Sequence, residues 1–407
     1  MLMKLINFNP FYLAIFNLLI IFGLGSCLSL SESSNQSTIQ PTANQTSQAS
    51  ETQPEEIKQV TMLEGLEHPW AIDWLPNGDI LITERPGRLR IIENGKLNPE
   101  PIQGVPEVFA VGQGGLLDVS VHPNFEENRY IYLTYASGNR NNNQTRIARA
   151  ILENNQLQDL EVIFEVSPSK TGGQHFGSRL VWLEDGTFLA SIGDGGNPPL
   201  TIDGELSRKQ AQQLDSYLGK IIRLNDDGSI PDNNPFVDQD NANSAIWSYG
   251  HRNIQGLTVN KESGEIWSTE HGSKGGDELN NIKAGGNYGW PEVTHSQEYS
   301  GGEISDKRSL PGMVDPLEVW TPAIAPSGLT LYDGDKFSDW KGDLLAGGLV
   351  AREVIRIDLN DANEIVGQYP IKFEQRVRDV SQGPDGLIYV LTDDRNGKLI
   401  RLEAVNN

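Results

Sequence analysis

The sequence predicts an all-β protein, a six-bladed β-propeller of four-stranded antiparallel blades, and three observations lead to this fold class. One unit recurs along the chain: an apolar or β-branched run, a turn that contains Gly, and a second strand of alternating polarity. Six copies occupy about 350 residues, a spacing that fits blades with long insertions. Helical patterns are scarce, and the best is a short stretch around residues 208–214.

Four copies predict a hairpin, because their Asn-Gly, Asp-Gly or Ser-Gly turns tolerate positive φ and their flanking strands have a period of two. The copies at 119–134 and 329–346 are looser versions of the same pattern. Radial repetition of such short sheets protects their edges, so blades around an axis are the predicted architecture. Functional residues are then expected just beyond strand ends, where loops from several blades meet. The six copies span residues 71–83, 119–134, 180–192, 257–269, 329–346 and 380–392.

The first 27 residues are predicted to form a secretory signal. Lys4 is followed by an apolar stretch that ends in Leu24-Gly25-Ser26-Cys27. This ending resembles the bacterial lipobox, in which the cysteine thiol receives lipid. An uncleaved membrane helix with an incidental cysteine is the alternative. The lipobox predicts export to the periplasm or cell envelope, with membrane contact only through a lipid anchor on Cys27.

Two further segments complete the predicted organisation. Residues 28–56 are rich in Ser, Thr, Gln and Asn and have almost no large apolar side chains. Such a segment cannot bury enough surface to offset the entropy cost of ordering, so it is predicted to be a disordered tether. The propeller is predicted to occupy residues 57–407.

The composition excludes several classes of function. With 55 Asp and Glu against 32 Lys and Arg, the chain has a net charge of −23, which disfavours binding to nucleic acid. A single cysteine excludes a disulfide framework within the chain. The sequence has no HExxH, GxSxG or P-loop pattern, so zinc protease, serine hydrolase and nucleotidase functions lack support.

Two groups of polar residues beyond predicted strand ends could carry chemistry. His175 precedes a predicted strand and is the best candidate for a proton acceptor near neutral pH, with a structural histidine as the alternative. Arg252, Arg376 and Arg378 could form an anion site in the channel. The alternative for these arginines is ion pairing with Asp379 and its neighbours.

The loop 272–278 is a third candidate, because small residues are followed there by the adjacent carboxylates of Asp277 and Glu278. Such a loop offers main-chain and side-chain oxygens to a hard cation such as Ca²⁺. Its spacing does not match an EF-hand. A solvated acidic loop is the alternative.

Five segments occur in order along the chain: Gly-Gln-Gly-Gly-Leu-Leu at 112–117, His-Phe-Gly-Ser-Arg-Leu at 175–180, Gly-His-Arg-Asn-Ile-Gln-Gly-Leu at 250–257, Gly-Asn-Tyr-Gly-Trp-Pro at 286–291 and Arg-Val-Arg-Asp-Val at 376–380. Together they resemble the soluble pyrroloquinoline-quinone-dependent (PQQ-dependent) aldose sugar dehydrogenases, the glucose/sorbosone dehydrogenase family. The resemblance covers residues 59–402. It implies a six-bladed propeller with the quinone over the axial channel, in agreement with the repeat count.

The resemblance also implies roles for single residues. His175 would be the general base that takes the proton of the anomeric hydroxyl of an aldose, while a hydride passes to the quinone. Electrons would then pass to an acceptor that the sequence does not identify. Carbonyl oxygens of Gly272 and Ser273 would hold a Ca²⁺ on the quinone, and Glu278 and Tyr288 would hold a second, structural Ca²⁺. The implied cofactor contacts are Gln113, Arg252, Asn253, Tyr299, Arg376 and Arg378.

One position departs from the family pattern. Val350 stands where relatives have a lysine near the quinone. Arg352 lies two residues further on, which along a strand is the same face, and we therefore include it among the expected cofactor contacts.

Two other functions remain open on the sequence. A propeller lipoprotein could bind a glycan or a protein partner without turnover, its site having lost the lysine at Val350. A Ca²⁺-dependent lactonase on a similar propeller would need a cluster of carboxylates at the channel, whereas this sequence places three arginines there.

Overall fold

The computed structural model describes residues 56–198 and 200–405. The predicted signal peptide, Cys27 and the predicted tether up to residue 55 lie outside these ranges. No helix within them is both long enough and apolar enough to cross a membrane.

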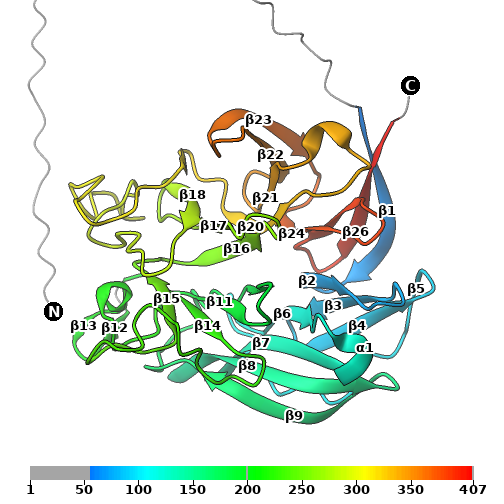
Figure 1. Ribbon diagram of the computed structural model, residues 1–407, viewed down its shortest axis with the longest axis horizontal. Helices are drawn as coiled ribbons and strands as arrows, with labels where there is room; N and C mark the ends of the chain where they lie inside the picture. The colour runs from blue at the N-terminus through cyan, green and yellow to red at the C-terminus, as the bar shows by residue number, and fades with distance from the viewer. Residues whose placement is uncertain (1–55, 199, 406–407) are drawn as a thin grey trace, which may run out of the picture. The chain divides into compact units, whose positions relative to one another are not determined.

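The described residues form six four-stranded antiparallel blades around an axis, which confirms the predicted propeller (Figure 1). The first three blades contain β2 (Pro69–Trp74), β3 (Ile80–Glu84), β4 (Arg88–Glu93) and β5 (Lys96–Leu97); β6 (Leu116–Val121), β7 (Tyr130–Asn139), β8 (Asn142–Glu153) and β9 (Gln156–Glu165); and β10 (Leu180–Trp182), β11 (Phe188–Ile192), β14 (Lys220–Leu224) and β15 (Ile246–Tyr249).

The other three blades contain β16 (Ile254–Val259), β17 (Ile266–Glu270), β18 (Asp277–Ile282) and β19 (Glu318–Trp320); β20 (Pro326–Leu331), β21 (Leu344–Gly348), β22 (Glu353–Leu359) and β23 (Ile365–Lys372); and β24 (Val377–Gln382), β25 (Ile388–Thr392), β26 (Gly397–Ala404) and β1 (Ile57–Leu66). Each of the six predicted hairpins is the pair of strands that opens a blade.

Few short elements lie outside the blades. The predicted helical stretch around 208–214 is a 3₁₀ helix, η1 (Ser207–Gln212), which ends two residues earlier than predicted. The others are α1 (Phe125–Asn128), the 3₁₀ helix η2 (Ser338–Trp340) and a ribbon of β12 (Thr201–Ile202) and β13 (Glu205–Leu206).

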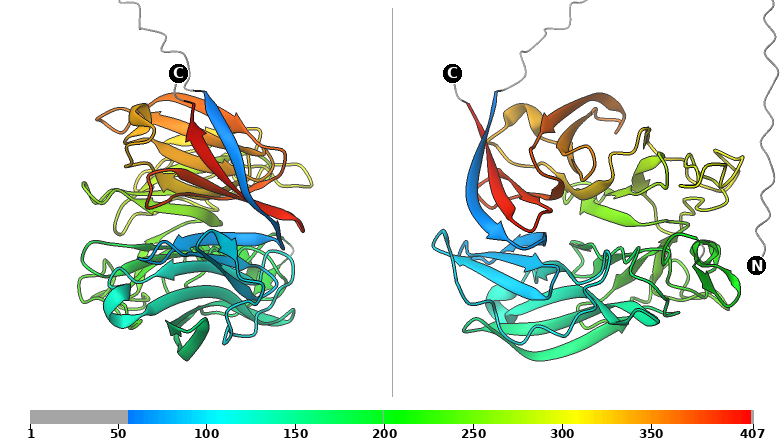
Figure 2. Two further views of the ribbon diagram at one scale, coloured as in Figure 1. Left: turned by 90° about the vertical axis from the view of Figure 1, so that its right-hand side faces the viewer. Right: turned by 180° about the vertical axis from the view of Figure 1, so that it is seen from behind.

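The last blade takes its outer strand from the beginning of the described chain. β1 pairs with β26 in antiparallel register, with Ile57 opposite Ala404. Figure 2 shows the blue β1 beside the red β26. Because this pairing joins both ends of the chain in one sheet, it closes the ring and leaves no blade without its fourth strand.

Apolar side chains fill the space between neighbouring blades. Strands β11 and β25 are buried at every residue, since each has a blade on both faces. Aromatic pairs join adjacent blades: the rings of Tyr132 and Phe188 lie 5.6 Å apart, and those of Trp74 and Tyr389 lie 5.3 Å apart. Burial of each such side chain stabilises the fold by about 1.5–3 kcal/mol.

The inner strand of each blade is β2, β6, β10, β16, β20 or β24, and aspartates on three of them bind the neighbouring blade. Oδ2 of Asp73 accepts a hydrogen bond from the backbone N–H of Val121 at 2.7 Å. Oδ2 of Asp118 accepts one from Leu180 at 2.6 Å, and Asp379 binds β2 in the same way. These side chains pair backbone groups that face the axis and would otherwise lack partners.

A buried ion cluster lies midway along the inner strands. The Arg179 guanidinium is 3.2 Å from Asp118 and 3.1 Å from Asp379, and it lies 4.5 Å from the ring centroid of Trp70. All three charged side chains are buried. Burial raises the pKa of Asp118 to about 7, and the charge of Arg179 opposes this rise. Separate cavities lie at the two ends of the inner strands, and we call each of them a mouth of the axial channel.

Candidate functional site

One mouth of the axial channel, which we call the arginine mouth, is a cavity of about 380 Å³ at the beginning of the inner strands. All six blades contribute to its wall, through Trp70, Leu117, Gly177, Gln255, Ala325 and Arg378. Four of the predicted cofactor contacts also line it: Gln113, Asn253, Arg376 and Arg378. The structure therefore brings together residues that are more than 250 positions apart in the sequence.

His175 lies in the loop that leads into β10, directly before two residues that line the arginine mouth. It is buried, and its φ of 49° places it in the left-handed region, which is uncommon for a residue with a side chain. Oε1 of Gln113 accepts a hydrogen bond from the His175 backbone N–H at 2.7 Å, and Oδ1 of Asn253 accepts one from Gly177 at 3.2 Å. Two predicted cofactor contacts thus hold the histidine loop in place.

The His175 ring is paired with Asp194, a residue that the sequence analysis did not single out. Nδ1 of His175 lies 2.6 Å from Oδ1 of Asp194, and Oδ2 of Asp194 accepts a hydrogen bond from the Trp290 indole at 2.8 Å. His175 lies shortly before β10, and Asp194 lies shortly after β11. Because the two strands are antiparallel neighbours, this adjacency could have been inferred from the predicted hairpin.

The surroundings of His175 favour its neutral form. Burial lowers its pKa below the usual 6.5, repulsion from Arg252 adds to this, and Asp194 opposes it. Burial raises the pKa of Asp194, but the hydrogen bond from His175, the charge of Arg252 and the hydrogen bond from Trp290 lower it below its usual value. An ionised Asp194 accepts a hydrogen bond from Nδ1–H of His175, so Nε2 is the nitrogen with a free lone pair.

Arg252 lies beside this pair. Its guanidinium donates to the carbonyl oxygen of His271 at 3.0 Å and to Oδ1 of Asn197 at 2.6 Å, and it lies 5.4 Å from the ring centroid of Trp290. Its buried Nε has no hydrogen-bond partner. His271 lines the arginine mouth, and burial, with added repulsion from Arg252, lowers its pKa to about 3.

Arg376 and Arg378 share one carboxylate, that of Asp393. Nη2 of Arg378 is 2.8 Å from Oδ2 of Asp393, and Nε of Arg376 is 3.6 Å from the same atom. Nδ1 of His68 is 2.9 Å from the other oxygen. The ion-pairing alternative named Asp379, but that residue pairs with Arg179 in the buried cluster. The buried Nε of Arg378 has no partner.

The loop predicted to hold Ca²⁺ is tightly folded. A Cβ on Gly272 would lie 2.2 Å from the carbonyl oxygen of Gly275, so only glycine allows this turn. Oδ1 of Asp277 accepts a hydrogen bond from the Gly272 N–H, and Oγ of Ser296 accepts one from Ser273. The carboxylate of Asp277 therefore orders the loop.

Glu278 points away from Asp277, as expected for adjacent residues of β18. The amide of Asn280 donates to Glu278 at 3.3 Å and to Glu270 at 3.2 Å, and its buried Oδ1 has no partner. Burial, followed by the charge of Glu270, raises the pKa of Glu278 well above its usual range. The Tyr288 hydroxyl donates to a carbonyl oxygen. Within the described residues, no group of three or more His, Cys, Asp or Glu side chains is arranged to hold a metal.

Three further positions from the sequence analysis lie outside the wall of the arginine mouth. Tyr299 and Val350 are each 61% exposed. Arg352 has a φ of 55°, and its Nη1 donates to the carbonyl oxygen of Glu374 at 3.4 Å. Only Leu349 of this segment lines the mouth.

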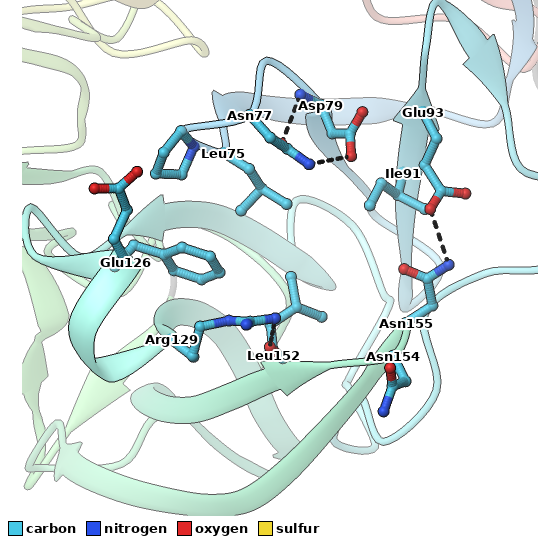
Figure 3. Close-up of a pocket in the computed structure, with 12 residues that line it drawn as sticks. Leu75, Asn77, Asp79, Ile91, Glu93, Glu126, Arg129, Leu152, Asn154 and Asn155 are labelled. Carbon is cyan, nitrogen blue, oxygen red and sulfur yellow. Dashed lines mark hydrogen bonds between the residues drawn. The ribbon is translucent and has the colours of Figure 1, made fainter.

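Two other cavities are larger than the arginine mouth. One, of about 640 Å³, lies between the first two blades, where Arg129 donates to Leu152 and Glu93 contacts Asn155 (Figure 3). The other, which we call the tryptophan mouth, has about 670 Å³ and contains Trp182. It lies at the opposite ends of the inner strands. Neither places a histidine–carboxylate pair beside several arginines.

Known proteins resemble this chain over most of its length. The family model described as Glucose / Sorbosone dehydrogenase matches residues 66–401. An uncharacterized Synechocystis protein is 54% identical over 94% of this chain and 96% of its own, and the aldose sugar dehydrogenase YliI of Escherichia coli is 38% identical over 87% and 94%. The PQQ-bound aldose sugar dehydrogenase of Streptomyces coelicolor superposes with a TM-score of 0.70 and 25% identity over 86% of this chain and 99% of its own. The chain therefore belongs to the glucose/sorbosone dehydrogenase family.

Proposed function

We propose that the protein oxidises aldose sugars at the anomeric carbon with PQQ as cofactor and His175 as general base. The observation that carries this proposal is the buried pair of His175 and Asp194 beside a cavity lined by arginines. The names of the E. coli and S. coelicolor relatives point to the same substrate class and cofactor.

The residues present fit an anionic quinone. Arg252 and Arg378 each have a buried guanidinium nitrogen without a partner, which a ligand carboxylate could satisfy. Arg376 and Arg378 lie on the cavity wall, and Arg252 lies beside His271. When bound, PQQ supplies the hydride acceptor that this oxidation requires.

In the proposed reaction Nε2 of His175 accepts the proton of the anomeric hydroxyl. The lowered pKa of His175 keeps the ring neutral and able to accept that proton at neutral pH. Asp194 holds the ring through Nδ1 and stabilises the imidazolium that results, while the Trp290 indole fixes the carboxylate.

Ca²⁺ is the proposed metal at two places. Carbonyl oxygens of Gly272 and Ser273 are the proposed ligands near the quinone. At the second place, Glu278 is proposed as a ligand, with Tyr288 through its backbone oxygen. The residues at this second place suit Ca²⁺ for two reasons. The carboxylates of Glu278 and Glu270 repel each other, and the buried Oδ1 of Asn280 has no hydrogen-bond partner. Ca²⁺ is expected to raise the melting temperature of the purified protein, and chelation to reverse this.

We also propose, from the lipobox-like ending alone, that the mature chain is exported and held at the cell envelope by lipid on Cys27. Mass spectrometry of the membrane fraction tests this, since an unlipidated mature N-terminus contradicts it. The electron acceptor in this setting is a further partner whose chemistry the site does not specify.

The central experiment is reconstitution. Purified protein is loaded with Ca²⁺ and PQQ and assayed for dye reduction with a panel of aldoses, and quinone binding is measured separately by calorimetry. Dye reduction that depends on sugar, quinone and Ca²⁺ supports the proposal. No reduction with any sugar, together with no quinone binding, contradicts it and favours a propeller that binds a glycan or protein without turnover.

A further inference from the structure

Arg85 is a third guanidinium on the wall of the arginine mouth, and none of the motifs in the sequence pointed to it. It directly follows β3 and lines the cavity together with Arg376, Arg378 and Asp393. Its Nη1 donates to the carbonyl oxygen of Gly112 at 2.6 Å.

The backbone of Arg85 is held on both sides. Its N–H donates to the carbonyl oxygen of His68 at 3.1 Å, and its own carbonyl oxygen accepts from Leu116 at 3.0 Å. A Cβ on Gly115 would lie 2.1 Å from the Arg85 carbonyl oxygen, so this close approach requires glycine. The position of the side chain is therefore imposed by two blades.

The charges on this wall do not balance. Asp393 is the only carboxylate among the described residues that line the arginine mouth, and it faces Arg85, Arg376 and Arg378. Burial lowers the pKa of Arg85, the other two arginines add to this effect, and Asp393 opposes it, so all four groups are within electrostatic reach. In a chain of net charge −23, two positive charges in excess at one cavity are unusual.

The hydrogen bonds of this wall are also incomplete. Nε of Arg85 and Nε of Arg378 are both buried without a partner. A buried donor without an acceptor is destabilising, and an anionic ligand removes this cost when its oxygen accepts the hydrogen bond. Excess charge and missing acceptors thus point to the same class of ligand, an anionic molecule with carboxylate oxygens.

We propose that Arg85 binds a carboxylate of the cofactor together with Arg376 and Arg378, and that it supplies positive charge that the uncharged Val350 does not. Val350 is 61% exposed, whereas Arg85 lines the cavity. This inference rests on the proposed function, because the carboxylate ligand in question is PQQ.

The test is the affinity of Ca²⁺-loaded protein for PQQ, measured by calorimetry without substrate. We expect the dissociation constant of Arg85→Gln to rise about tenfold or more, as for the loss of a charge-assisted contact. Arg85→Lys keeps the charge but loses the paired N–H donors of the guanidinium. Its dissociation constant for PQQ should therefore lie between those of Arg85→Gln and the wild type. The matched control is Arg129→Gln, because Arg129 also donates to a carbonyl oxygen and lines the other cavity in Figure 3.

Wild-type affinity in a folded Arg85→Gln protein would overturn the inference. If Arg85→Gln does not fold, Arg85→Lys decides: a raised dissociation constant supports a contact that needs the guanidinium donors, and an unchanged one overturns the inference. If the wild type binds no quinone, the proposed function fails, and citrate is then the probe. A rise of melting temperature with citrate that is lost in Arg85→Gln still supports an arginine site for carboxylates, and equal or absent shifts reject it.

Discussion

The two mouths of the axial channel are built on the same strands but differ in how their polar side chains are paired. Both are ringed by the same six inner strands, one at the strand beginnings and the other at the strand ends. The tryptophan mouth is the larger, at about 670 Å³ against about 380 Å³. Volume alone would therefore select the end of the channel opposite the proposed site.

The difference lies in how polar groups are paired. At the tryptophan mouth, Nε1 of Trp182 donates to Ser120 at 3.0 Å and Oε1 of Gln382 accepts from Asp333 at 2.9 Å. None of the described residues lining it has a buried side-chain nitrogen or oxygen without a partner, whereas two arginines at the other mouth do. Unpaired buried donors require an explanation, and a ligand that supplies acceptors is one that cavity volume does not reveal.

The largest expected effect concerns the ion cluster between the two mouths. In Arg179→Met, the carboxylates of Asp118 and Asp379 stay buried without their cation, so the free energy of unfolding should fall by about 3–5 kcal/mol. The loss should be greater at pH 8 than at pH 5, because protonation relieves the buried charge. Denaturant unfolding measures this loss at both pH values. The control is Arg146→Met, because Arg146 is more exposed and its removal should lower the free energy of unfolding by only about 0–1 kcal/mol. A loss below about 1 kcal/mol for Arg179→Met contradicts the cluster's role.

A matched pair of histidine variants compares the mouths in catalysis. His175→Gln should lower kcat by about 10²-fold or more while quinone affinity is retained, as expected for the loss of a general base. His122→Gln alters a buried histidine at the tryptophan mouth and should leave kcat unchanged. Steady-state dye reduction measures both. Equal effects of the two substitutions would remove His175 from the mechanism.

The pH dependence of kcat sharpens the assignment of His175. A lowered pKa means that the ring stays neutral as pH falls past 6.5 and becomes protonated only below that value. Activity should therefore persist at pH 6.5 and decline at lower pH. An acidic limb centred above pH 6.5 in reconstituted enzyme would show that another group titrates.

The smallest expected effect concerns Lys170, a buried lysine within electrostatic reach of His175 and Asp194. Its Nζ is 3.0 Å from Oδ1 of Asn143 and 3.7 Å from the ring centroid of Phe176. Lys170 helps to lower the pKa of His175, so in Lys170→Met the acidic limb should move to higher pH by a fraction of a pH unit.

Lys261 provides the matched control for that shift, because it lines the tryptophan mouth. In Lys261→Met the pH profile of kcat should coincide with that of the wild type. A shift to lower pH in Lys170→Met, or equal shifts in both variants, would contradict the local effect of Lys170.

Much of the architecture could be predicted because it depends on local sequence. Turn residues that tolerate positive φ, such as Gly78 and Gly186, set each hairpin, and strand periodicity sets which side chains face the core. Counting hairpins then predicted six blades. The pairing of β1 with β26 could not be obtained in this way, because it joins residues more than 300 positions apart.

The site was only partly predictable for the same reason. His175 and the arginines were found from segments beyond strand ends, and the family resemblance gave them roles. Asp393 and Arg85 follow strands without any distinctive motif, and their importance depends on charges from other blades. Arg352 was expected to share a strand face with Val350, but both residues lie in the turn between β21 and β22, where Arg352 has a φ of 55°.

By itself, the sequence of this protein determined the repeated hairpins, the number of blades and the acidic character of the chain, since each depends on neighbouring residues or on composition. The tertiary structure alone decided which end of the channel carries unpaired guanidinium groups, which carboxylate orients His175 and which residues neutralise one another. These outcomes depend on distances between blades and on burial, and both arise only when the ring has closed.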